Sequence, residues 1–476
     1  MTQTITIDPV TRIEGHAKVV LELTDDGAVD FAGMVIPELR GFERILVGME
    51  AAEMPLITAR ICGVCPSAHH LAAVKAIEAA FGVDPPPAAK LQRELLYMGH
   101  FIHSHAVHLF ALAGPDLVLG VRGDAKKRGI AAVAEAAPEV AKKALRLRTL
   151  GQKLNELLGG RGVHPITAVV GGMAAPMTEE ARDSARTMAE ECVSLEAELQ
   201  GILEGLLDKL LAEMPMLVSD SLSIPSCYMG TVKEEKVNFY DGLIRIVDAS
   251  GNKLLDFEVQ DYDKYLVERP VDWSYTKPVY LREAAGVPDG TLYRVSNLAR
   301  LNCAEAMETP GAEAALQAYR SQYPRPCHLT FLHLATRLIE LQYACENARR
   351  LAEHPDLLKE NRIAATVRAG RGVGHVEAPR GTLIHDYTVD DAGIVRAANL
   401  LVATQQNFAA INQTIAQTVN MFGVKDDALL DGVEFGIRLY DPCLSCATHA
   451  VGKMPLELIL RRNGREVKRL ERRDTW

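Results

Sequence analysis

Two Cys-x-x-Cys pairs near opposite ends of the chain constrain its fold most strongly. The first pair is Cys62 and Cys65, and the second is Cys443 and Cys446. Four thiolates in two close pairs are soft ligands, which transition metals and iron–sulfur clusters prefer. Cys443 stands 381 positions after Cys62. If the pairs share one site, nearly the whole fold lies between them and must bring the two ends together.

The composition is that of a globular protein with a full core. Of the 476 residues, 48% are hydrophobic and 24% are charged. The net charge of −10 argues against binding to nucleic acid or to an anionic membrane surface. Since no apolar run reaches the roughly 18 residues of a membrane span, and no basic segment precedes an apolar one at the N-terminus, we expect a cytoplasmic protein.

Hydrophobic periodicity predicts an α+β fold that is mainly helical, with β structure in an N-terminal segment and in an insertion. Alternating residues predict a small sheet over 4–36, and aromatic and β-branched residues predict a β-rich insertion at about 218–300. Residues 370–386 are rich in glycine and are expected to form an irregular or short-strand segment of the kind that often carries function. Helical patterns cover residues 67–82, 88–113, 128–158, 178–213, 312–322, 328–353 and 390–422.

Three kinds of metal site fit the cysteine pairs. A structural zinc site would close four thiolates around a tetrahedral ion, although such sites usually staple a small region. An iron–sulfur cluster is the second possibility, and a catalytic metal with an open position is the third. The pairs are flanked by charged and titratable residues, which suit proton-coupled chemistry: Arg60, His69, Asp441 and His449. Spacing alone leaves all three readings open.

Other candidate ligands give weaker signals. His103, His105 and His108 lie on one predicted helix, but their spacing does not place all three on one face. We expect them to be buried histidines with satisfied hydrogen bonds rather than a metal triad. The remaining cysteines are scattered singly and are expected to be reduced core thiols: Cys192, Cys227, Cys303, Cys327 and Cys345.

Five ordered motifs carry a family resemblance. They occupy residues 8–16, 40–43, 60–65, 377–381 and 441–449. Together they resemble the large, catalytic subunit of nickel–iron hydrogenases, over nearly the whole chain. The sequence that follows the second cysteine pair is most similar to the soluble, bidirectional, NAD-reducing subgroup. The resemblance implies a large helical body around a buried bimetallic site.

The resemblance assigns different roles to the two cysteines of each pair. It implies that Cys62 and Cys443 are terminal nickel ligands, and that Cys65 and Cys446 bridge nickel to an iron carrying carbon monoxide and cyanide. One departure from many membrane-bound relatives is Ser104, where those proteins carry an acid. Because a serine cannot ionise, a second carboxylate above the metals is not expected here.

The resemblance also implies the residues that surround the metals. Glu14 would exchange protons with Cys443, Arg380 would hang over the open metal position, and Asp441 would hold that arginine. His69 would hydrogen-bond a bridging thiolate. A normal arginine pKa lies above about 12, so a thiolate relayed by Glu14 is the expected base rather than Arg380.

Two further sites follow from the same resemblance. Thr404 and the backbone of Pro379 and Arg380 would line a pocket for the cyanide ligands. Glu43, the carbonyl of Leu400 and His449 would hold a buried Mg²⁺.

The implied activity is reversible cleavage of H₂ into two protons and two electrons. The other cysteines are scattered singly and offer no set for an iron–sulfur cluster of its own, so electrons are expected to leave through an iron–sulfur small subunit. They would reach diaphorase subunits, carrying flavin and iron–sulfur clusters, that reduce NAD⁺. The alternative within the family is coupling to NADP or a deazaflavin. Outside it, a non-catalytic subunit related to respiratory complex I and a structural zinc protein are the other readings.

The last segment of the chain differs in charge from the rest. Residues 450–476 hold eight Lys or Arg against four Asp or Glu. In the resembling family an extension after the last histidine is removed by a dedicated protease once nickel-insertion factors have acted. We therefore expect one domain over 1–449, and cleavage between His449 and Ala450.

Overall fold

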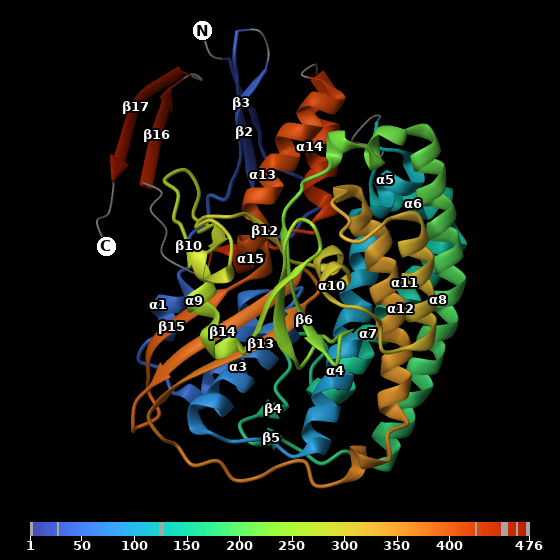
Figure 1. Cartoon of the computed structure of the whole chain (residues 1–476), viewed down its shortest axis with the longest axis vertical. Helices are drawn as coiled ribbons and strands as arrows, with labels where there is room; N and C mark the ends of the chain where they lie inside the picture. Colours follow the sequence, from blue (N-terminus) through green and yellow to red (C-terminus); the bar gives the residue numbers. More distant parts are fainter. Residues whose placement is uncertain are drawn as a thin grey trace.

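A bundle of long helices lies beside several small sheets (Figure 1). This computed structural model describes residues 3–25, 28–122, 128–423, 426–448, 456–462 and 465–472. The α+β fold class expected from the sequence is confirmed. Among the described residues, no helix is both long and apolar enough to cross a membrane.

The bundle packs lengthwise around a shared apolar core. Its long helices are α4 (Pro87–Ala106), α7 (Pro138–Gly159), α8 (Glu179–Glu213), α11 (Pro310–Gln322) and α12 (His333–Ala352). Proline begins α4, α7 and α11, where its missing N–H costs nothing. The shorter helices α5 (Gly114–Leu119) and α6 (Ile130–Ala136) and a π-helical turn (Val107–Leu112) connect α4 to α7.

The strands form separate small sheets rather than one large one. The N-terminal sheet is antiparallel and contains β1 (Gln3–Ile7), β2 (Lys18–Leu23) and β3 (Val29–Val35). A second antiparallel sheet contains β13 (Gly370–Ala378), β14 (Gly381–Val389) and β15 (Val395–Leu401). Two pairs stand apart, β4 (Ala168–Val169) with β5 (Gly172–Met173), and β16 (Leu456–Arg462) with β17 (Arg465–Arg472).

The segment at 218–300 holds the remaining strands. One sheet combines β6 (Cys227–Lys233), β7 (Lys236–Val237), β8 (Leu243–Val247), β9 (Lys253–Phe257) and β12 (Tyr293–Arg294). A short pair follows, β10 (Leu266–Glu268) with β11 (Val279–Leu281). The other helices are α1 (Phe42–Leu46), α2 (Met54–Thr58), α3 (Pro66–Phe81), α9 (Tyr262–Tyr265), α10 (Asn297–Cys303), α13 (Ala403–Phe422), α14 (Asp426–Leu439) and α15 (Leu444–Ala447).

One element prediction was wrong, and another was confirmed only in its strand alternative. Residues 390–422 do not form one helix, because Val395–Leu401 pairs with β14 before α13 begins at Ala403. Residues 370–386 were expected to be irregular or short strands; most of them lie in two paired strands that are longer than expected. In both places sheet pairing between distant residues decides the conformation, and periodicity within one segment does not report such pairing.

Glycines let strand β13 lie directly on helix α3. A Cβ atom added to Gly374 would lie 2.4 Å from the backbone N of Ala76 and 2.6 Å from the carbonyl O of Ala72. One added to Gly372 would lie 2.0 Å from the carbonyl O of Ala76. The alanine-rich face of α3 and the glycines of β13 therefore fit together by having no side chains between the two backbones. This contact joins the helix after Cys65 to the strand that leads to Arg380.

Replacing Gly374 by Ala should lower the free energy of unfolding by about 1–3 kcal/mol, because the new methyl group meets backbone atoms that cannot turn aside. Thermal or urea unfolding measures this. Gly205→Ala is the matched control, since nothing lies within 4 Å of a Cβ added at that position in α8. The control should gain about 1 kcal/mol from helix propensity. Equal stabilities for the two variants would contradict the packing argument.

Candidate metal centre

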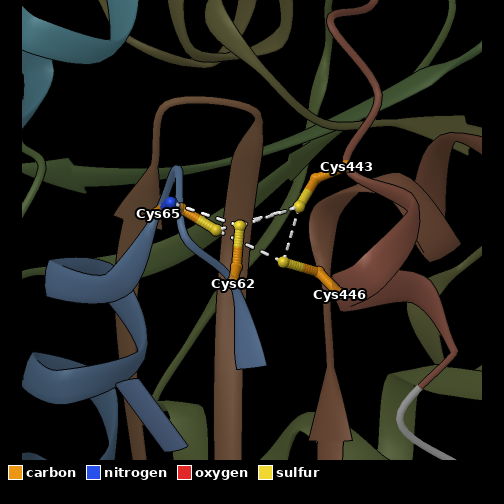
Figure 2. A group of neighbouring side chains, drawn as sticks. All are labelled: Cys62, Cys65, Cys443 and Cys446. Atoms are coloured by element: carbon orange, nitrogen blue, oxygen red, sulfur yellow. Dashed lines mark hydrogen bonds between the residues drawn. The ribbon is translucent and has the colours of Figure 1, made fainter. Parts of the chain in front are cut away.

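The two cysteine pairs meet in the core, as Figure 2 shows. Cys62 follows a short 3₁₀ turn, and Cys65 precedes the first residue of α3. Cys443 is the N-cap of the short helix α15, and Cys446 lies within that helix. The four Sγ atoms lie within 4.8 Å of one another, and all four cysteines are buried and free of disulfides. The closest pairs are Cys443 with Cys446 at 2.7 Å and Cys65 with Cys446 at 3.2 Å.

The charge state of these thiols fits a site for a multivalent cation. Burial raises the pKa of Cys62, but hydrogen bonds from the other three thiols and the charge of Arg380 outweigh it, so that this pKa falls well below its usual value. Burial and the neighbouring sulfurs raise the pKa of Cys443 well above its usual value. The protein alone thus supports a thiolate at Cys62 but not at Cys443. Four buried thiolates need a soft cation between them, and this donor set suits nickel and iron.

Arg380 lies at the turn between β13 and β14, beside the sulfurs. Its Nε donates to the backbone O of Asp441 at 2.6 Å, and its Nη2 donates to Asp441 Oδ1 at 3.0 Å. Both residues are buried. Although burial lowers the pKa of Arg380, Asp441 and the thiols raise it well above its usual value. Burial raises the pKa of Asp441, yet Arg380, His108 and Arg337 bring it below its usual value. The pair therefore stays ionised.

Glu14 contacts the segment that carries the second cysteine pair. Its backbone O accepts a hydrogen bond from Leu444 N at 3.2 Å, and its Oε2 accepts one from Ser445 N at 3.0 Å. Glu14 and Cys443 also form an isolated parallel bridge. Thr404, in the first turn of α13, accepts a hydrogen bond from Cys443 N through Oγ1 at 2.8 Å. The N-terminal loop and α13 thus hold the second cysteine pair from two sides.

His69 reaches the sulfurs from helix α3. Its Nε2 lies 3.4 Å from Cys446 Sγ, and its Nδ1 lies 3.0 Å from Nε2 of His385. His385 in turn contacts the hydroxyl of Tyr387 at 2.7 Å. Sequence reasoning found His69 but missed His385 and Tyr387. Because His385 and Tyr387 are two residues apart on β14, their side chains lie on the same face of that strand, but no sequence motif identifies them.

A small cavity of about 20 Å³ adjoins three of the sulfurs. Its lining includes Cys65, Cys443 and Cys446 together with His69, Ala378, Arg380, Leu383, Val402, Ala403 and Thr404. The lining is mostly apolar, with Arg380 and Thr404 as its polar edges. Thr404 and Arg380 thus line this cavity, and the buried Pro379 precedes Arg380 in the same turn without lining the cavity.

The residues predicted to bind Mg²⁺ are only partly within the described structure. Glu43, near the start of α1, lies beside the end of β15, and its Oε1 accepts a hydrogen bond from Leu400 N at 2.7 Å. This contact uses the N–H of Leu400 and not its carbonyl. His449 lies outside the described residues.

The histidines of α4 and of the π-helical turn after it do not form a metal site. His105 Nε2 lies 3.1 Å from Glu340 Oε2, and His108 Nε2 donates to the carbonyl of Arg438 at 2.8 Å. The described residues provide no partner for Nδ1 of His103, His105 or His108, so the expectation of fully satisfied rings was wrong. Burial lowers the pKa of His103 to about 4 and that of His108 to about 3, which keeps both rings neutral. Ser104 between them is buried, and its Oγ likewise has no partner among the described residues.

Comparisons with known proteins agree on the family. A family model for nickel-dependent hydrogenases matches residues 40–143, and a HoxL-like model matches residues 4–39. The chain is 43% identical to a subunit of the F420-non-reducing hydrogenase vhu of Methanococcus voltae, over 88% of this chain and 98% of that protein. It is 34% identical to the beta subunit of the NAD-reducing hydrogenase HoxS of Cupriavidus necator, over 96% of each.

A solved structure matches at the level of the whole fold. The chain resembles a subunit of an NAD⁺-reducing [NiFe]-hydrogenase in the H₂-reduced state, with a TM-score of 0.88 and 37% identity. The match covers 94% of this chain and 99% of that one. The buried cysteine group, the fold and the identity to these relatives lead to one conclusion. The chain belongs to the nickel-dependent hydrogenases and is the catalytic large subunit of a nickel–iron hydrogenase.

Proposed function

We propose that this subunit cleaves H₂ heterolytically and reversibly, with protons leaving through Glu14 and electrons leaving through a partner subunit. The observation that carries this proposal is the group of four buried cysteine sulfur atoms, within 4.8 Å of one another, beside the ion pair of Arg380 and Asp441. When bound, the nickel–iron group supplies the two-electron redox chemistry that the side chains lack.

The four cysteines are proposed to divide the metals between them. Cys62 and Cys443 would bind nickel alone, and Cys65 and Cys446 would bind both nickel and iron. The Sγ atoms of Cys65 and Cys446 lie 3.2 Å apart, a distance that allows one metal ion to contact both. The small cavity lined by Cys65, Cys443 and Cys446 supports an iron with diatomic ligands, carbon monoxide and cyanide, because its surface is mostly apolar.

The side chains around the sulfurs are proposed to handle the proton. A thiolate at Cys443 would receive it, and Glu14 would carry it away through the N-terminal loop. The hydrogen bond from Ser445 N orients the Glu14 carboxylate toward this segment. Arg380 would orient substrate and exclude water rather than act as a base, because Asp441 keeps it protonated.

Further sites complete the proposal. His69 would donate a hydrogen bond to Cys446, with His385 on its other ring nitrogen setting the tautomer. Thr404 and the backbone of Pro379 and Arg380 would hold the cyanide ligands. Glu43, the Leu400 carbonyl and His449 would bind Mg²⁺, supported so far by the contact between Glu43 and Leu400.

The electrons are proposed to pass through an iron–sulfur small subunit to diaphorase subunits that reduce NAD⁺. The whole-fold likeness to an NAD⁺-reducing enzyme supports this acceptor. The greater identity to F420-non-reducing hydrogenases supports a different electron-accepting partner as the second candidate.

The purified complex should reduce NAD⁺ with H₂ at a rate comparable to its reduction of an artificial viologen dye, since both reactions begin at the same metals. Spectrophotometry at the NADH absorption band measures this. A complex that reduces viologen but not NAD⁺, NADP⁺ or a deazaflavin would contradict the NAD⁺ acceptor and favour the F420-non-reducing type.

The active protein is proposed to have lost residues 450–476. Its mass should correspond to a chain ending at His449, and the same sample should contain nickel and iron and show infrared bands of carbon monoxide and cyanide. Mass spectrometry, metal analysis and infrared spectroscopy test these points together. An active chain still ending at Trp476 would contradict cleavage. Zinc without such bands would contradict the metal assignment.

Replacing Glu14 by Gln should reduce H/D exchange and H₂ turnover by about 10²–10⁴-fold, because the amide keeps the hydrogen bond from Ser445 N but cannot carry a proton. Nickel and iron contents should stay unchanged. Glu38→Gln, which removes an exposed carboxylate paired with His16, is the control and should leave exchange intact. Full exchange activity in the Glu14 variant would remove that residue from the proton route.

A further inference from the structure

Helix α12 presents a buried polar stripe to the core. His333, Thr336, Arg337 and Glu340 follow one another at spacings of three, one and three residues, which places them on neighbouring positions of one face. All four are almost completely buried. A helix face packed inside a protein is usually apolar, so these side chains call for an explanation.

Arg337 makes a single hydrogen bond despite its full burial. Its Nη1 donates to Asp441 Oδ2 at 2.7 Å, while Nε and Nη2 have no partner in the part of the chain that the structure describes. Asp441 already has a cationic partner in Arg380. Burying a guanidinium for one contact with a carboxylate that is already paired opposes stability. Stability of the fold therefore does not account for Arg337.

Glu340 stands nearly one turn further along the helix and holds another arginine. Its two oxygens accept hydrogen bonds from Nε and Nη2 of Arg300, each at 2.6 Å. The remaining nitrogen, Nη1, donates to Glu377 Oε2 at 2.8 Å and to the carbonyl of Ala378 at 3.0 Å. Ala378 is the last residue of β13, two positions before Arg380. Glu340 thus reaches the backbone of the turn that carries Arg380.

We propose that Arg337 and Glu340 are positioning residues that hold Arg380 at both ends. Arg337 holds the guanidinium through Asp441, and Glu340 holds the backbone through Arg300. Both contacts start from one rigid helix, so the arginine stays in place above the sulfurs. This inference rests on the proposed function, because holding Arg380 in place matters only if Arg380 acts at the metal centre.

Arg337→Met separates this role from a structural one. Asp441 keeps Arg380 as its partner in this variant, so no buried charge is left unpaired. Thermal unfolding of the metal-free protein should therefore occur at the same temperature as in the wild type or higher. After metal loading, H₂ turnover should fall by about 100-fold, the effect typical of a misplacement of about 1 Å. Arg337→Lys restores the charge and should recover part of the turnover.

Arg294→Met is the matched control, since Arg294 is equally buried but donates hydrogen bonds to several partners. Arg294 donates to Ser226 Oγ, the carbonyl of Ile224 and the hydroxyl of Tyr228. This variant should unfold at a lower temperature and keep its turnover per nickel.

Three outcomes decide the matter. Full turnover in Arg337→Met would overturn the inference, and so would a fall in its unfolding temperature as large as that of Arg294→Met. A wild-type protein that binds nickel and iron but fails to turn over H₂ would instead overturn the proposed function itself.

Discussion

The meeting of two chain ends at one buried set of sulfur atoms is the constraint on which the structure depends. Cys62 and Cys443 are 381 positions apart, yet their Sγ atoms lie 3.3 Å apart. The second pair is held by distant parts of the chain: Glu14 binds Ser445 N, Thr404 binds Cys443 N, and the N–H groups of Arg40 and Gly41 bind the carbonyl of Thr448. The large helical body holds these distant segments in fixed positions relative to one another.

Buried charge is the second physical theme. Three acids and three arginines are buried together beside the sulfurs and form ion pairs: Glu340, Glu377, Asp441, Arg300, Arg337 and Arg380. Such charges are tolerated only because each has an opposite partner. Arg300 also lies against the rings of Phe101 and Phe239. The result is a preorganised electrostatic environment that does not depend on solvent, as chemistry with protons and electrons requires.

The sequence motifs identified many residues of the metal centre, but not the residues that hold them in place. The cysteines, Glu14, His69, Arg380, Asp441 and Thr404 lie together as expected. Arg337, Glu340 and Arg300 were not found, because a helical pattern looks the same whether its polar residues face solvent or core. The prediction of one helix over 390–422 failed for a similar reason. Val395–Leu401 pairs with β14, and a pattern within 390–422 does not report pairing with residues outside it.

The sequence by itself determined the donor set, the family and the mainly helical class, because ligand chemistry and hydrophobic periodicity are local properties of a chain. Only the tertiary structure decided which distant groups touch. In the tertiary structure Asp441 lies between Arg337 and Arg380, His385 contacts His69, and the glycines of β13 pack against α3. These contacts depend on distances between elements far apart along the chain, and those distances are set by packing of the whole core.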